Sequence, residues 1–269
     1  MKIGFIGAGN MATALIGGLS AKAQALDIVV CDPVAAQRDA VAGRYRAIAS
    51  QDNQDAARSD VLVLAVKPQY MAEATRGVAA AVRQHEPLVI SVAAGVRASA
   101  IVSWLDGYAR IVRTMPNRPA LMGAGVTGLH AAATLSPADR KAAQQVMEAV
   151  GTTVWVEQEA DLDTVTAVSG SGPAYFFLLI ELLDEAAREL GLTPETARTL
   201  AIETAHGAAL LARAREFTPK ELREQVTSRG GTTAAALAVL EEADLRGIVR
   251  RAVTAAGRRS AELAAQFGA

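Results

Sequence analysis

Lys2-Ile3-Gly4-Phe5-Ile6-Gly7-Ala8-Gly9-Asn10-Met11-Ala12 decides the fold, because an apolar strand pattern runs directly into a glycine-rich turn and a helical pattern. The small residues follow the spacing Gly-x-Gly-x-x-Ala, which is typical of a dinucleotide-binding βαβ unit. Gly7 allows the tight turn, and Gly9 lets a pyrophosphate approach the backbone at the positive end of the helix dipole. The alternative is a glycine turn in an α/β protein that binds no nucleotide, and the clean strand before the turn favours the cofactor. The predicted contacts are Ile6, Gly7, Ala8, Gly9, Asn10 and Met11.

Composition and charge narrow the class of protein. The formal net charge of −1 gives no field that would favour nucleic acid or an anionic membrane as a partner. The single cysteine, Cys31, excludes a disulfide within the chain and fits a reducing compartment as a small core residue. No signal-peptide pattern precedes the first strand, and acidic residues from Glu181 to Glu185 interrupt the longest apolar run. We expect a cytoplasmic protein that binds neither nucleic acid nor membrane.

Strand and helix patterns alternate along the first 160 residues. Continuous apolar runs such as residues 61–66 indicate strands that are buried on both faces, as in a parallel sheet covered by helices. The predicted strands are residues 2–6, 28–31, 61–66, 88–92, 110–115, 125–129 and 153–156. Helices are predicted at residues 11–21, 34–42, 71–83 and 137–150.

After Asp161 only helical patterns follow, with start signals at Thr193-Pro194 and at the capping box Thr218-Pro219-Lys220-Glu221. Gly191 is the expected end of a helix over residues 174–190. The fold class is therefore α/β: a Rossmann-type dinucleotide-binding domain over residues 1–160, followed by an all-helical domain over residues 161–269. Residues 176–183 are apolar almost all round a helix, which predicts a homodimer formed by this second domain.

Six segments, in this order, carry a resemblance that covers residues 2 to about 260. They are Gly7-Ala8-Gly9-Asn10-Met11, Ala65-Val66-Lys67-Pro68-Gln69, Ser91-Val92-Ala93-Ala94-Gly95-Val96, Arg113-Thr114-Met115-Pro116-Asn117, Ser169-Gly170-Ser171-Gly172-Pro173-Ala174-Tyr175 and Thr227-Ser228-Arg229-Gly230-Gly231-Thr232-Thr233. Together they closely resemble the pyrroline-5-carboxylate reductase family, which catalyses the last step of proline synthesis. Arg118 and Arg229 stand where that family more often shows Thr and Pro. The resemblance implies NADPH or NADH as cofactor, an imine as substrate, and a dimer that can build higher oligomers with each active site completed across the dimer.

Two strand ends are predicted to hold the cofactor, because ligands of open α/β sheets bind beyond the carboxyl ends of the strands. The turns after the strands at 61–66 and 88–92 supply Ala65, Val66, Lys67, Pro68, Ala93, Ala94 and Gly95. The residues alone equally allow ordinary strand-to-helix connections, and the resemblance favours the cofactor and adds Asn53. We assign Lys67 as a contact and not as an acid, since no partner in the sequence would activate it as an acid.

The segment from Ser228 to Thr233 is the predicted substrate site. Gly230 and Gly231 precede a helical run and expose amides that suit a carboxylate, while Thr232 and Thr233 add hydroxyls; Ser228 lies beside them. The alternative is plain helix capping by Ser or Thr. The resemblance implies that the Thr233 hydroxyl lies near the imine nitrogen, where it orients the substrate, because an unactivated threonine is a poor acid.

Different residues of the sequence favour different cofactors. Asp32 follows the second strand at the distance expected for a contact with the ribose 2′-hydroxyl of NAD, but it is equally placed to cap the next helix. Ala12 in place of a third glycine, and Arg38 one helical turn on, favour NADP. We leave the choice between NADPH and NADH open. No metal site is expected, because His85, His130 and His206 share no ligand spacing.

Two other functions compete with the leading one. A β-hydroxyacid dehydrogenase shares the layout of a Rossmann domain and a helical domain but commonly uses a catalytic lysine in the latter. Lys220 is the only lysine after Lys141, and it lies in a capping position. A nucleotide-sensing module without catalysis would need no substrate anion site, so the Gly230–Thr233 segment counts against it. Ser171 is read as part of a helix start and not as a nucleophile, because no strand leads into it.

Overall fold

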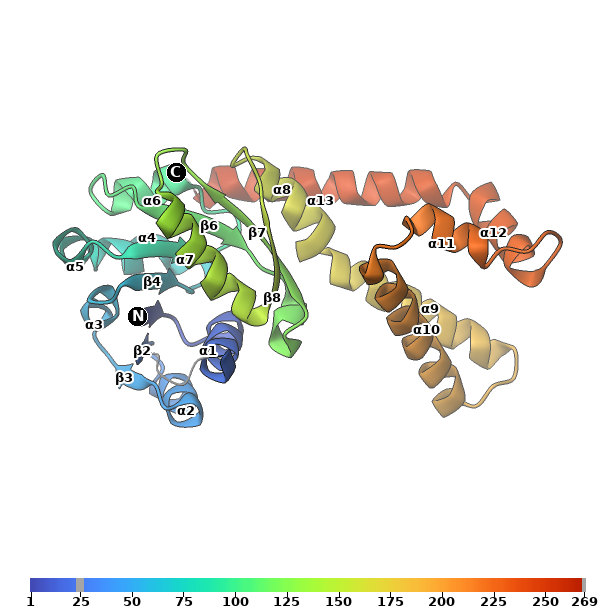
Figure 1. Cartoon of the computed structure of the whole chain (residues 1–269), viewed down its shortest axis with the longest axis horizontal. Coiled ribbons are helices and arrows are strands. Elements are labelled where there is room, and N and C mark those ends of the chain that lie inside the picture. The colour runs from blue at the N-terminus through green and yellow to red at the C-terminus, as the bar shows by residue number, and fades with distance from the viewer. Residues whose placement is uncertain (23–26, 268–269) are drawn as a thin grey trace. The chain divides into compact units, whose positions relative to one another are not determined.

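The computed structural model describes residues 1–22 and 27–267. The chain forms two compact units, one of Met1–Ser171 with Ala256–Ala269 and one of Gly172–Ala255 (Figure 1). The first unit extends past the boundary predicted at residue 160, because Leu162 and Ala167 bury their side chains within it. Residues 268 and 269, the end of the predicted helical domain, lie outside the described residues.

The first unit is built on one eight-stranded sheet with the order β3-β2-β1-β4-β5-β6-β7-β8. Strands β1 to β6 run parallel, β7 is antiparallel to β6, and β8 is parallel to β7. The order reverses between β1 and β4, as in doubly wound dinucleotide-binding folds. The strands are β1 Lys2–Ile6, β2 Asp27–Cys31, β3 Ile48–Ser50, β4 Val61–Leu64, β5 Leu88–Ser91, β6 Ile111–Met115, β7 Gly125–Ala131 and β8 Gly151–Trp155.

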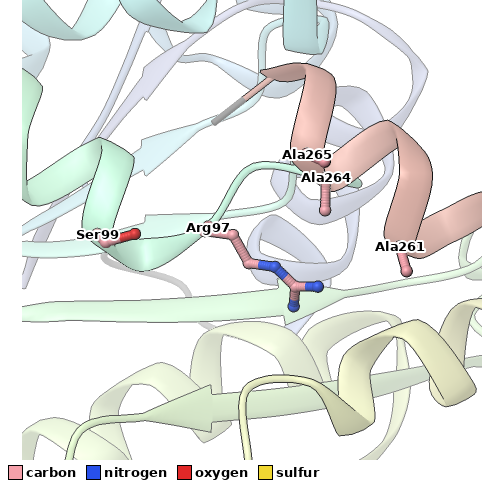
Figure 2. A pocket seen from close by; sticks show the side chains of 5 residues that line it. All are labelled: Arg97, Ser99, Ala261, Ala264 and Ala265. Carbon is pink, nitrogen blue, oxygen red and sulfur yellow. The ribbon is translucent and has the colours of Figure 1, made fainter. Parts of the chain in front are cut away.

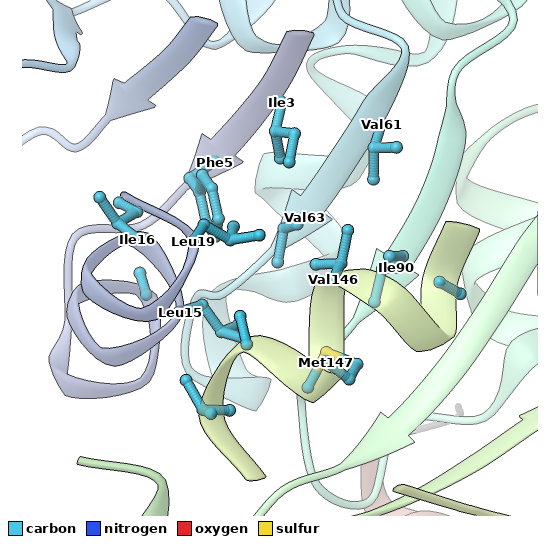
Figure 3. Close-up of a cluster of buried hydrophobic side chains, with 14 of the residues drawn as sticks. Ile3, Phe5, Leu15, Ile16, Leu19, Val61, Val63, Ile90, Val146 and Met147 are labelled. Carbon is cyan, nitrogen blue, oxygen red and sulfur yellow. The ribbon is translucent and has the colours of Figure 1, made fainter. Parts of the chain in front are cut away.

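Helices cover both faces of this sheet. They are α1 Asn10–Lys22, α2 Ala35–Tyr45, α3 Asn53–Ala57, α4 Pro68–Arg76, α5 Ala79–His85, α6 Ala98–Trp104, α7 Pro137–Met147 and α8 Asp161–Val165, with short turns η1 Arg118–Met122, η2 Glu148–Val150 and η3 Thr166–Gly170. Alternate strand residues enter different clusters: Phe5 and Val63 pack against Leu15 and Met147 (Figure 3), while Ile6 and neighbours pack under α3 to α6. The double burial explains the continuous apolar strands.

Several predicted elements need correction. The single helix expected at 71–83 is two helices, α4 and α5, separated at Gly77. The short edge strand β3 and helix α3 were not predicted, because β3 has only three residues and none of them is buried. The antiparallel direction of β7 also departs from the expected parallel sheet. Cys31 is fully buried, as expected of a core residue, and burial raises the pKa of its thiol to about 11.

The second unit contains only helices among its described residues, as predicted. They are α9 Gly172–Glu189, α10 Pro194–Ala214, α11 Pro219–Gln225, α12 Thr232–Glu242 and the start of α13 Leu245–Phe267. The predicted boundaries are confirmed: Thr193 caps α10, Thr218 and Glu221 form a capping box, and Gly191 ends α9 with a φ of +96°. Hydrogen bonds from the Gly191 and Leu192 amides to carbonyls of α9 complete that end.

Helix α9 leaves most of its apolar side chains exposed in the single chain. Phe176 is 65% exposed, and Phe177, Leu179, Leu182 and Leu183 are exposed to similar degrees. The stretch Asp161–Glu189 is long and apolar enough to cross a membrane by length and composition alone, which corrects the expectation that its charges exclude this. Only 11% of its most apolar window is buried in the structure. A face of this kind needs a cover.

Candidate functional site

The predicted cofactor residues gather at one edge of the sheet. Backbone hydrogen bonds continue past the strand ends, from the Gly7 amide to the Cys31 carbonyl at 2.7 Å and from the Ala65 amide to the Ile6 carbonyl at 2.8 Å. The Val92 amide donates to the Leu64 carbonyl at 3.1 Å. The turns that follow β1, β2, β4 and β5 therefore lie next to one another at the carboxyl edge, where such folds bind their ligands.

Gly7 and Gly9, the two glycines of the first turn, are explained by different physical requirements. Gly7 has a φ of +104°, and a Cβ there would lie 2.6 Å from the Ala65 carbonyl oxygen, so this position requires glycine for folding alone. A Cβ at Gly9 would meet nothing within 4 Å. Packing therefore gives no reason for glycine at position 9, whereas the approach of a pyrophosphate to the N-terminus of α1 does. The residues fit a dinucleotide.

Asp32 makes contacts that address the alternatives left open for it. Its Oδ2 accepts a hydrogen bond from the Ala8 amide at 2.8 Å, and its Oδ1 accepts one from the Val34 amide at 2.8 Å. The carboxylate thus ties the glycine-rich turn to the segment that begins α2. This arrangement favours a structural role beside the cofactor, and it leaves the preference between NADPH and NADH undecided.

The other predicted cofactor contacts occupy connecting turns at the same edge. Ala65 and Val66 are half-buried, Lys67 is the exposed N-cap of α4, and Pro68 is the first residue of that helix. Asn53 begins α3, directly after Asp52, whose side chain accepts a hydrogen bond from the Gln54 amide. Their contact with a cofactor stays a prediction.

The third predicted loop has a buried turn. Ala93 and Gly95 are buried and Ala94 is exposed, and Gly95 has a φ of +74°. A Cβ at Gly95 would lie 3.3 Å from the Phe267 side chain and 3.6 Å from the Ala264 amide nitrogen, so the last turns of α13 pack directly on this loop. The left-handed backbone favours glycine here, and the close approach of the helix leaves little room for a Cβ.

The predicted substrate segment forms the start of α12 in the second unit. Gly231 is the N-cap residue, and it has no side chain that could accept a hydrogen bond from the first amides of the helix. Gly230 has a φ of +70°, and a Cβ at Gly231 would lie 2.5 Å from Ser228 Oγ. Thr232 and Thr233 are the first two residues of the helix and not its cap. The geometry therefore disagrees with plain capping by a threonine and leaves the helix N-terminus open to an anion.

Two other motifs of the sequence meet at a π-helical turn. Residues Thr166–Gly170 form this turn, in which the Ser171 amide donates to the Thr166 carbonyl at 2.8 Å. Pro173 has no amide hydrogen, and Asn117 Nδ2 donates to the Ser169 carbonyl at 3.0 Å, one α-helical turn before it. Asn117 Oδ1 accepts from the Val126 amide at 2.9 Å. The helix start predicted in this segment is confirmed at Gly172, the first residue of α9, and a π turn, a feature frequent at functional sites, precedes it.

Arg113 is a buried charge whose partner the sequence analysis missed. It lies in the middle of β6, is 5% exposed, and donates from its guanidinium to Glu159 Oε1 at 2.8 Å. Burial lowers the pKa of Arg113, and the bond to Glu159 opposes this shift. A charged residue inside a buried strand was the available signal, but no periodicity points to a carboxylate 46 residues away.

The alternatives for catalysis gain no support from the structure. Lys220 lies in the first turn of α11, where its side chain is 75% exposed and 3.8 Å from Glu224. Within residues 1–22 and 27–267, no group of three His, Cys, Asp or Glu side chains is placed to hold a metal ion.

Comparison with known proteins gives the family. A family model described as pyrroline-5-carboxylate reductase dimerisation matches residues 159–263, and one described as NADP oxidoreductase coenzyme F420-dependent matches residues 2–95. A pyrroline-5-carboxylate reductase of Pseudomonas aeruginosa is 46% identical over 269 residues, with 99% of this chain and 98% of that protein covered. This chain belongs to the pyrroline-5-carboxylate reductase family. The resemblance stated from the six motifs is thereby confirmed.

Other members of the pyrroline-5-carboxylate reductase family agree in sequence and in structure. The enzyme of Pasteurella multocida is 46% identical over 272 residues, covering 99% of this chain and 98% of that one. The structure of a pyrroline-5-carboxylate reductase from Coxiella burnetii has a TM-score of 0.93 at 42% identity, with 97% of each chain covered. A Plasmodium falciparum pyrroline carboxylate reductase solved with NADP bound has a TM-score of 0.84 at 28% identity, with 98% of each chain covered. The predicted architecture, a Rossmann-type domain followed by a helical dimerisation domain, is confirmed.

Proposed function

We propose that this chain reduces the imine bond of 1-pyrroline-5-carboxylate to give L-proline, the last step of proline biosynthesis, with NADPH or NADH as the cofactor. Membership of the pyrroline-5-carboxylate reductase family supports the reaction. The observation that carries the proposal is the pairing, in one chain, of a glycine turn shaped for a dinucleotide with an uncapped helix N-terminus after Gly230 and Gly231. A nucleotide sensor would need only the first.

The residues at the carboxyl edge of the sheet bind and position the cofactor, which supplies the hydride when bound. Gly9 leaves the backbone open for the pyrophosphate, and the amides of the first turn of α1 stabilise its charge. Lys67, Asn53 and the loop around Ala94 complete the contacts in this proposal. The role of the protein here is placement of the cofactor against the substrate.

The start of α12 binds the substrate. The amides after Gly231 donate hydrogen bonds to the carboxylate, and Ser228, at one side of the turn, adds a hydroxyl. Thr233 is the residue we assign to catalysis: its hydroxyl orients the imine nitrogen and does not supply the proton, because its pKa is far from neutral pH. The substrate arrives as its iminium or takes its proton through a water.

The helical domain, residues 161–269, is proposed to form a homodimer. The exposed side chains of α9 supply an apolar, self-complementary surface, and the match to a dimerisation domain supports protein and not lipid as its cover. Each active site is completed across the dimer, and dimers build higher oligomers. We place the enzyme in the cytoplasm, without nucleic acid or membrane as partners.

The direct experiment is an absorbance assay at the nicotinamide band with 1-pyrroline-5-carboxylate, run with NADPH and NADH in parallel. We expect oxidation of at least one cofactor and formation of proline. Folded protein that oxidises neither cofactor would contradict the proposed reaction.

A further inference from the structure

Side chains from distant parts of the first unit converge just behind the predicted cofactor loop, residues 93–97. Arg97 Nη2 lies 2.5 Å from Asp163 Oδ2, and Arg97 Nη1 donates to the Glu159 carbonyl at 3.4 Å. The next residue, Ala98, donates its amide to Glu159 Oε1 at 2.6 Å. The end of the loop is therefore fixed to α8 and to the segment before it.

The same two carboxylates reach two further elements. Glu159 Oε1 also accepts from Arg113 of β6 at 2.8 Å, and Asp163 Oδ1 accepts from Ser260 Oγ of α13 at 2.8 Å. Ser260 and Arg113 are buried, and Arg97 and Asp163 are mostly buried. In such surroundings a charge that loses its partner is costly, so these contacts hold their geometry more firmly than surface ion pairs do.

Apolar packing between the loop and α13 is incomplete. A pocket of about 270 Å³ lies there, lined by Arg97, Ser99, Ala261, Ala264 and Ala265. Figure 2 shows the Arg97 side chain between the start of α6 and the last turns of α13, whose pocket residues are alanines. The polar contacts of Arg97 and Asp163 thus connect the loop 93–97 to α13 at a place where side-chain packing between them leaves a pocket.

We propose that Arg97, through Asp163 and Ser260, is a positioning residue that holds the loop 93–97 in its cofactor-binding shape against the end of α13. The inference rests on the proposed binding of NADPH or NADH at this loop. The end of α13 contacts the loop at Gly95, because Phe267 and Ala264 pack on this residue. No cofactor contact by Arg97 itself is required, since its guanidinium already has two partners.

Arg97→Met tests the proposal, because it keeps the length of the stem and removes the charge, and Arg97→Lys restores the charge. Arg110→Met is the matched control, since Arg110, directly before β6, forms an ion pair at 2.6 Å with Asp139 of α7 in the same unit. The first readout is the Kd of NADPH from nicotinamide fluorescence. The second is hydrogen exchange of the amides of residues 93–98, with the melting temperature recorded for every variant.

We expect Arg97→Met to raise the Kd of NADPH about tenfold and to speed exchange of the loop amides, and Arg97→Lys to restore most of the affinity. Arg110→Met should lower the melting temperature and leave the Kd unchanged. An unchanged Kd in folded Arg97→Met, or an equal rise in Arg110→Met, would overturn the inference.

If Arg97→Met does not fold, Ser260→Ala is the second test, because it removes one hydrogen bond to Asp163. It should raise the Kd of NADPH about twofold to threefold, and an unchanged Kd in this variant overturns the inference. A parent protein that binds neither NADPH nor NADH would instead overturn the proposed cofactor site.

Discussion

The two units of the chain bury their apolar residues to very different extents. In the first unit, every residue of β4 and β5 is buried, and helices on both faces complete two apolar clusters. In the second unit, the 18-residue helix α9 buries only Gly172, and α11 and α12 bury no residue. The first unit is complete as a folded body, whereas the second exposes a surface that a single chain does not cover.

This difference separates two kinds of information in the sequence. The proposed binding edge for the cofactor is formed within one chain, by strand ends and by glycines whose close neighbours belong to the same unit. In our proposal, the helical domain carries the substrate-binding segment on a scaffold that depends on assembly of the dimer. Cofactor binding and catalysis should therefore respond differently to the loss of the dimer.

The largest effect is expected from Leu183→Asp on α9, where the leucine is 52% exposed in the single chain. Each partner would lose roughly 1.5–3 kcal/mol of apolar burial and would place a carboxylate in the interface. We expect a monomer without reductase activity that still binds NADPH, measured by light scattering, assay and fluorescence titration. Leu183→Met is the control and should remain an active dimer. A Leu183→Asp variant that is active as a monomer would contradict the proposal that the second unit depends on the dimer.

Gly9→Val should affect the first unit in its function and not in its fold. The added side chain meets no protein atom near its Cβ but occupies the proposed place of the pyrophosphate. We expect normal circular dichroism and a loss of cofactor affinity of about a hundredfold or more, roughly 3 kcal/mol. Gly7→Ala is the contrast, because its Cβ would collide with the Ala65 carbonyl, and it should unfold the protein at lower temperature. Unchanged NADPH affinity in Gly9→Val would place the phosphates elsewhere.

Most of the first unit follows from local patterns. The continuous apolar run at Val61–Leu64 gave its strand, and the spacing of Gly7 and Gly9 gave the turn, because both depend on neighbours within a few residues. In the second unit the caps at Thr193 and Thr218 were equally local.

The features that the sequence did not reveal depend on distant partners. The bond from Asn117 to Ser169 and the pair of Arg113 with Glu159 join residues 52 and 46 positions apart. Such polar contacts leave no periodicity, so they become visible only when the fold brings the partners together. The role of Thr233 in orienting the imine remains a prediction for the same reason, since the substrate segment alone does not specify its partners.

Thr233→Val tests the proposed role of the Thr233 hydroxyl, in the second unit, in orienting the imine. The change keeps the side-chain shape and leaves a polar group of the substrate unpaired, at a cost of about 1–3 kcal/mol. We expect a tenfold to hundredfold fall in turnover, on the order of that free energy, with the Kd of NADPH unchanged. Normal kinetics would leave Thr233 as an ordinary residue of the first helical turn.

The smallest effect is expected from Asp32→Asn in the first unit. The change removes the charge of the group that accepts hydrogen bonds from the Ala8 and Val34 amides. We expect the binding of NADPH and of NADH to weaken equally, by about fivefold or ~1 kcal/mol. Fluorescence titration with both cofactors measures this. Weaker binding of NADH together with tighter binding of NADPH would instead assign Asp32 to the ribose.

The concentration dependence of assembly and activity tests the difference between the units most directly. Sedimentation or light scattering of the unaltered protein from nanomolar to micromolar concentration is compared with reductase activity and with NADPH affinity. We predict that activity per chain falls together with the dimer as the protein is diluted, or that the dimer persists with full activity throughout this range. A fully active monomer at any concentration would contradict both the dimer and the shared active site.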